Sequence, residues 1–246
     1  MTRTTQLLIA AAAVLVVAVV GYNLLPTRPS SIGGQPTLVP TATATQVPTA
    51  TPVASPTIPT GSLAPGTYTE RDAKYTSAAF SFTVPAGWSY DGGSIFKGTI
   101  TQAAALSIDA WLVDNVYMDA CNWRGAFAAV GPTKADLVAA LTAQVGVKRT
   151  GPTNVTLGGL AAAKFVLAEA PGRPASSCDG GFIHIWPDAG GNEGGGEPLP
   201  SGSTTTIYVI ESGGHATAFV AQSPKGATSA DLAERQAILA SMTFLP

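Results

Sequence analysis

The chain has 246 residues, of which 46% are hydrophobic and only 11% are charged, with a formal net charge of −2. Its four Trp, six Tyr and eight Phe supply enough apolar surface for a core, so a fully disordered chain is excluded. The 13 Lys and Arg are outnumbered by 15 Asp and Glu and form no cluster, so no nucleic-acid partner is expected. Two Cys and two His are too few for a typical Cys/His metal site, and we expect neither a metal nor a cofactor.

The N-terminal segment, residues 1–25, carries no charge between Leu7 and Leu25. As a helix these 19 residues would extend about 28 Å, close to the roughly 30 Å hydrocarbon core of a bilayer. We therefore predict a single transmembrane helix that contacts the lipid bilayer through residues 7–25. Arg3 precedes the apolar run and favours a cytoplasmic N-terminus, so the remaining chain is predicted to lie outside the cytoplasm at the cell membrane. The alternative is a secretory signal whose cleavage releases a secreted protein.

Residues 26–66 contain nine prolines and nine threonines and carry no charge after Arg28. This composition cannot form a packed core and favours extended backbone. We predict a disordered Thr/Pro-rich linker. Charged and aromatic residues return together from Thr67 onward, so residues 67–246 are predicted to form one extracytoplasmic domain of ordinary size.

Several segments of this domain have the signature of β-strands. Hydrophobic and polar residues alternate strictly in Phe80–Val84, as in a strand buried on one face. Two Gly-Gly pairs, at 158–159 and 213–214, separate apolar segments and suit the turns of tight hairpins. Further strands are expected in three apolar runs: Ser94–Gly98, Leu106–Tyr117 and Phe182–Trp186.

Two helices are predicted from their start signals. Thr133 with Asp136, and Thr228 with Asp231, place a hydroxyl and a carboxylate three residues apart, as in a capping box. Apolar side chains then recur on one face of each segment. They are Leu137, Val138, Leu141 and Val145 in the first segment, and Leu232, Ile238, Leu239 and Met242 in the second. Hairpins combined with only two main helices predict an α+β fold, in which helices layer an antiparallel β-sheet.

The domain also shows a fixed order of motifs between residues 66 and 244. They are GTYT, FSFTVPAGW, a capped helix, NVTLGGLAAAKFVL, TIYVIESGGHATAFVAQ and a closing helix that runs into ILASMTF. This order resembles the PsbP-like fold of the extrinsic photosystem II protein and of LpqN-type bacterial lipoproteins. It is also similar to a group of secreted bacterial domains with GTYT and VPxGW motifs. The resemblance implies the fold, but the motifs are structural and carry no catalytic signature. The lipoproteins begin at a lipid-bearing Cys, which this chain lacks.

Cys121 and Cys178 are the only two cysteines, and an even number in an exported chain favours one disulfide bond. The alternative is two buried free thiols. A redox-active pair is not expected, because the two residues do not form a C-x-x-C motif.

The residues around Cys121 are the best candidate binding surface. Tyr117, Asp119, Trp123 and Arg124 combine two aromatic rings with charged groups, and aromatic and Arg side chains commonly anchor protein partners.

Catalytic chemistry is only weakly indicated. Asp109, Asp114 and Asp119 recur at five-residue intervals, a spacing that favours solvated positions on a strand over a convergent pair. His184 and His215 lack a second His at ligand spacing.

Two further patterns are weak. Ser94 and Lys97 match the S-x-x-K pattern, but they lie in a predicted strand. Residues 188–197 form a Gly-rich loop with Asp, Asn and Glu oxygens that could hold Ca²⁺, although the EF-hand order fails at Gly190. A polar loop is the preferred interpretation of this segment.

The leading hypothesis is a non-enzymatic, membrane-tethered extracytoplasmic domain that binds a surface protein or a small ligand. One alternative is an envelope enzyme whose site is assembled from scattered acidic residues and His184. A second alternative is a structural accessory subunit of a larger surface complex.

Overall fold

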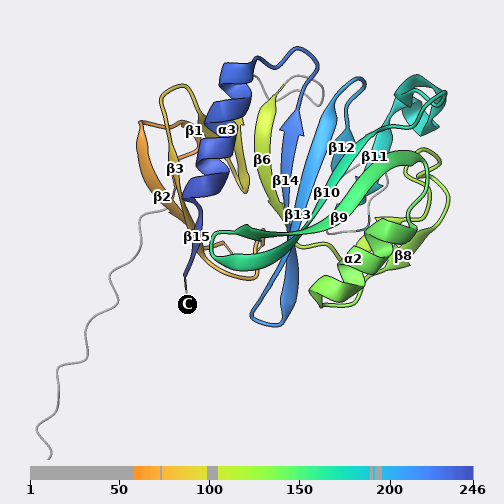
Figure 1. Ribbon diagram of the computed structural model, residues 1–246, viewed down its shortest axis with the longest axis horizontal. Helices are drawn as coiled ribbons and strands as arrows, with labels where there is room; N and C mark the ends of the chain where they lie inside the picture. Colours follow the sequence, from red (N-terminus) through yellow and green to blue (C-terminus); the bar gives the residue numbers. More distant parts are fainter. Residues whose placement is uncertain (1–57, 73, 99–104, 189–190, 192–195, 246) are drawn as a thin grey trace, which may run out of the picture. The chain divides into compact units, whose positions relative to one another are not determined.

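The computed structural model describes residues 58–245, except for residues 73, 99–104, 189–190 and 192–195 (Figure 1). The predicted membrane segment at residues 7–25 and most of the predicted linker lie outside the described residues. Within the part that is described, no helix is both long enough and apolar enough to cross a membrane.

The described residues are built around an eight-stranded antiparallel sheet with the strand order β1-β4-β5-β6-β14-β13-β10-β9. Two of its hairpins, β9–β10 and β13–β14, turn at the predicted Gly-Gly pairs, where all four glycines adopt positive φ angles. The strands are β1 (Gly61–Ser62), β4 (Ser89–Asp91), β5 (Ser94–Lys97), β6 (Leu106–Trp111), β9 (Val147–Leu157), β10 (Leu160–Glu169), β13 (Thr204–Ser212) and β14 (His215–Ser223).

A hydrophobic core lies on each face of the central sheet. Successive side chains of a strand point to opposite faces, and in β13 Ile207 and Val209 join one apolar cluster while Tyr208 and Ile210 join the other. Two hydrophobic cores therefore lie on the two faces of one sheet.

The first face packs against α3 (Ser229–Ser241) and a three-stranded sheet in the order β15-β3-β2. Figure 1 shows α3 beside β3. Ile238, Leu239 and Met242 bury their side chains here with Phe80 and Phe82. The strands are β2 (Gly66–Glu70), β3 (Phe80–Val84) and β15 (Thr243–Phe244).

The second face packs against α2 (Lys134–Ala143) and two hairpins, one formed by β7 and β8 and one by β11 and β12. Leu137 and Leu141 of α2 are buried, together with Ile183 and Ile185 of β11. The strands are β7 (Asn115–Tyr117), β8 (Phe127–Ala129), β11 (Ile183–Trp186) and β12 (Glu197–Leu199), and two 3₁₀ turns, η1 (Ala175–Ser177) and η2 (Asp179–Gly181), precede β11.

Both predicted helix starts are confirmed. Thr133 and Thr228 are N-caps, and each forms a complete capping box with the Asp three residues later. Val145 differs from its prediction, because α2 ends at Ala143 and the Val145 side chain is 56% exposed.

The strand predictions need one correction. The run 106–117 is two strands, β6 and β7, because the chain leaves the central sheet after Trp111. The folded unit also extends N-terminal of Thr67, since β1 pairs with β4 and the side chains of Ile58 and Leu63 are buried in the first core.

Candidate functional site

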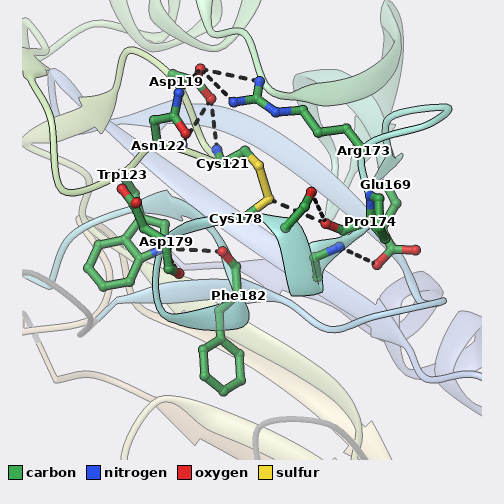
Figure 2. Close-up of a disulfide and its surroundings, with 12 residues drawn as sticks. Asp119, Cys121, Asn122, Trp123, Glu169, Arg173, Pro174, Cys178, Asp179 and Phe182 are labelled. Carbon is green, nitrogen blue, oxygen red and sulfur yellow. Dashed lines mark hydrogen bonds and ion pairs between the residues drawn. A yellow bond between two sulfur atoms is a disulfide. The ribbon is translucent and has the colours of Figure 1, made fainter.

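The Cys121–Cys178 disulfide joins the loop between β7 and β8 to the segment before β11 (Figure 2). We call residues 115–129 and 173–186 the disulfide lobe. Hydrogen bonds reinforce the covalent link, since the Asp179 N–H donates to the Cys121 carbonyl at 2.8 Å and the His184 N–H donates to the Ala120 carbonyl at 2.9 Å. Two segments that are far apart in the sequence are therefore joined by a covalent bond and by backbone hydrogen bonds.

Asp119 organises the top of this lobe in Figure 2. Its Oδ1 accepts hydrogen bonds from the backbone N–H groups of Cys121 (2.9 Å) and Asn122 (3.1 Å), and its Oδ2 accepts from both terminal nitrogens of Arg173 at 3.2–3.3 Å. Partial burial opposes ionisation, but these backbone donors and the Arg173 guanidinium outweigh it and lower the pKa of Asp119. The negative charge of Asp119 therefore stabilises the contacts that hold the lobe together.

Trp123 and Arg124 are anchored on the other segment. The Trp123 indole Nε1 donates to the carbonyls of Asp179 (2.8 Å) and Phe182 (3.1 Å). The Arg124 N–H donates to the Asp179 carboxylate at 2.9 Å, and its guanidinium lies 5.2 Å from the Trp123 ring centroid, a cation–π distance.

Five rings form a continuous chain through the disulfide lobe. The ring centroids of Phe127 and Tyr117 are 6.3 Å apart, those of Tyr117 and Trp123 are 6.2 Å apart, and those of Trp123 and His184 are 4.7 Å apart. The Phe182 ring completes the chain at 6.3 Å from His184. The three middle rings are buried, whereas the two terminal phenylalanines are 43% and 44% exposed. Figure 2 shows the Phe182 ring pointing away from the disulfide.

The large hydrophobic side chains that are exposed in the described residues all belong to this region. They are Met118, Phe127 and Phe182 in the lobe and Val145 beside it. Val145 adjoins Met118, because its N–H donates to the Met118 carbonyl at 2.9 Å. Exposed apolar side chains gathered in one region of a domain are a feature of interaction surfaces.

A second polar cluster lies between β6, β12 and β14. Asp109 accepts hydrogen bonds from the hydroxyls of Ser94 and Ser107, and Glu197, which is 1% exposed, accepts from the Gln222 side chain. Burial raises the pKa of Glu197 well above its usual range, and the Asp109 carboxylate raises it further. Burial also raises the pKa of Asp109. These carboxylates are enclosed between the sheet and β12.

The remaining candidates from the sequence are dispersed. The Ser94 hydroxyl donates a hydrogen bond to Asp109. Lys97, three residues further along the same strand, forms ion pairs with Asp231 at 3.0 Å and Glu234 at 2.9 Å. The two groups of the S-x-x-K match therefore have separate partners.

The loop at 188–197 is covered only in part by the described residues. Across the segments that are described, no group of three or more His, Cys, Asp or Glu side chains is placed to hold a metal ion.

Comparisons with known proteins show a distant structural similarity and no family. No protein-family model matches the chain, and no curated protein matches it. The chain is similar to a solved structure of LpqN, described as involved in cell envelope biogenesis of Mycobacterium tuberculosis, at 15% identity and a TM-score of 0.39. The match covers 73% of this chain and 91% of LpqN. This is a distant structural relationship, and no argument on fold or function rests on it.

The four predicted binding residues lie in one region but have different roles. Arg124 is exposed, Asp119 is half-buried, and Tyr117 and Trp123 are buried at 0% and 5% exposure. The two buried rings support the surface from beneath.

The sequence does not predict three exposed apolar residues of the lobe. Phe182 is expected to be the first residue of a strand, but β11 begins one residue after it. The proximity of Met118 and Phe127 to Cys121 in the sequence is the available signal for these two residues.

Proposed function

We propose that this chain is a non-enzymatic extracytoplasmic domain that docks a protein partner on the disulfide lobe. The carrying observation is the chain of five rings that ends in the exposed side chains of Phe127 and Phe182. Aromatic and Arg side chains dominate binding energy at protein interfaces, and anchors held by buried neighbours lose little conformational entropy on binding. Arg124 supplies a charged group beside these anchors.

The extracytoplasmic location is supported by the disulfide, because such bonds persist mainly in oxidising compartments. In this proposal the predicted helix at residues 7–25 tethers the domain to the cell membrane.

The alternative of an envelope enzyme has weaker support. An active site needs converging polar groups that substrate can reach. His184 is enclosed within the ring chain, Asp119 is bound to Arg173, and Asp109 is bonded to two serine hydroxyls. The structural accessory subunit remains a form of the binding proposal, because it would use the same surface.

Site-specific photocrosslinking tests the proposal in cells that produce the full chain. A photoreactive side chain at Ala126, exposed between Arg124 and Phe127, is expected to capture a partner protein, whereas one at Asn154, exposed on β9, is not. Phe127→Ser or Phe182→Ser should reduce the Ala126 product at least about tenfold, as expected for interface anchors.

The thermal unfolding of each variant serves as the control for folding. Equal labelling from Ala126 and Asn154, or an unchanged product in folded Phe182→Ser and Phe127→Ser variants, would contradict docking on this lobe. A crosslinked product of twice the mass of the chain would identify the partner as a second copy of this chain.

A further inference from the structure

A cleft of about 440 Å³ lies at the opposite end of the β7–β8 hairpin from Phe127. Four segments line it: residues 76–77 before β3, residues 112–114 after β6, residues 130–132 before α2, and residues 215–216 at the start of β14. Its volume lies within the usual range of small-ligand sites.

The walls of this cleft are fixed by hydrogen bonds between the four segments. The Ala216 N–H donates to the Pro132 carbonyl at 2.6 Å, and the Val130 N–H donates to the Asp114 carbonyl at 2.8 Å. The Ser77 N–H donates to the Thr217 hydroxyl at 3.1 Å. A cleft held in this way is formed before a ligand arrives, so binding costs little reorganisation.

The lining combines an apolar body with few polar groups. Leu112, Val113, Val130, Pro132 and Ala216 supply the apolar surface. Such a lining favours a ligand with a hydrocarbon body and a small number of polar atoms.

The charge at the cleft is negative. Asp114 lines it, and among the described residues its carboxylate has neither an ion pair nor a side-chain hydrogen bond. The N-terminus of α2, which would otherwise attract an anion, is already occupied by two carboxylates. Asp136 accepts from the Thr133 N–H at 3.1 Å, and Glu211 accepts from the Lys134 N–H at 2.8 Å. The Lys134 ammonium donates to the Ala161 carbonyl and does not line the cleft.

We propose that this cleft binds a small organic cation, with its ammonium group at the Asp114 carboxylate and its hydrocarbon body against Val113, Val130 and Ala216. The His215 imidazole at the rim provides a further hydrogen-bonding group. This site is separate from the disulfide lobe, so either proposal stands if the other fails.

Three probes with the same ring and different charges test the proposal: benzylamine, benzyl alcohol and benzoate. Binding is measured by isothermal titration calorimetry on the full chain in nanodiscs of uncharged lipid. The heat measured with empty nanodiscs is subtracted. Benzylamine is expected to bind about fivefold or more tightly than benzyl alcohol, and benzoate most weakly, as for a partly screened ion pair.

Asp114→Asn should lower the affinity for benzylamine by about fivefold and leave that for benzyl alcohol unchanged, because only the charge interaction is lost. Glu234→Gln removes the same charge from α3, which packs on the other face of the sheet, and should leave both affinities unchanged. Equal affinities for the three probes, no binding of benzylamine, or equal losses in the two variants would overturn the proposal.

Discussion

At the scale of single residues, Asp119 determines the path of the chain around the disulfide. Its carboxylate joins the turn at residues 121–122 to Arg173 and lies close to Gly146, which follows α2. Gly146 has a φ of +89°, and a Cβ atom there would lie only 2.2 Å from the Asp119 Oδ1 and 2.8 Å from the Cys121 nitrogen. The sequence between α2 and β9 therefore requires glycine for both its backbone angle and its missing side chain.

We expect Gly146→Ala to lower the free energy of unfolding by roughly 1 to 3 kcal/mol, since the backbone angle is unfavourable and the carboxylate must move. Gly159→Ala is the matched control, because Gly159 has a similar φ of +87° and a Cβ atom there would have no other atom within 4 Å. Chemical denaturation of both variants measures the difference. Equal losses would show that contact with Asp119 contributes nothing.

The candidate binding surface could be predicted from the sequence only in part. The types of the residues and their closeness to Cys121 indicate the right region, because a disulfide holds its neighbours in place. Exposure could not be predicted, because it depends on segments more than 50 residues away: the partners of Trp123 are the carbonyls of Asp179 and Phe182. The buried Tyr117 and the exposed Phe182 could not be distinguished without these contacts.

At the scale of the elements, β12 places the carboxyl group of Glu197 against the central sheet, close to Asp109. A carboxyl group whose pKa is raised on folding binds its proton more tightly in the folded state than in the unfolded chain. Stability is then greatest at low pH and falls as the pH rises from the ordinary range of Glu through the raised pKa of Glu197. Carboxylates such as Asp231, whose pKa is lowered to about 2, act in the opposite direction, but only at acidic pH.

Glu197→Gln should therefore stabilise the protein near neutral pH and flatten the decline in stability as the pH rises above the ordinary range of Glu. Up to the raised pKa, the gain should grow by about 1.4 kcal/mol for each pH unit above the ordinary pKa of Glu. Thermal unfolding across this range measures it, and Asp91→Asn, at an exposed position of β4, is the control. A variant whose profile runs parallel to that of the unmodified chain would contradict a raised pKa of Glu197 in the folded state.

Elements with strong local signals were predictable, and those stabilised by distant contacts were not. The Gly-Gly hairpins and the two capping boxes depend on a few adjacent residues, and the structure has each of them. The strand β12 is only three residues long and contains a Glu and a Pro, which disfavour strands. It forms because β11 pairs with it and Gln222 bonds Glu197.

At the scale of the whole molecule, the described residues depend on layers that cover both faces of one sheet. On the second face, these layers include strands and 3₁₀ turns of only three or four residues each. Within this layer, the disulfide joins the loop after β7 to the segment before β11, across a sequence separation of 57 residues. It therefore supplies the stability that short elements lack.

Replacing both cysteines by alanine should lower the free energy of unfolding by about 4 kcal/mol in the chain-entropy model and lower Tm by about 10 °C. Reductant should have the same effect on the unmodified chain and none on the double variant, which separates loss of the bond from other effects of the reagent. The hydrogen bonds that Asp119 accepts and Trp123 donates remain in the variant, so the folded lobe should keep its arrangement and only its stability should fall. A Tm unchanged by reductant would show that the bond does not contribute to stability. It would also remove the main physical reason for folding the domain in an oxidising compartment.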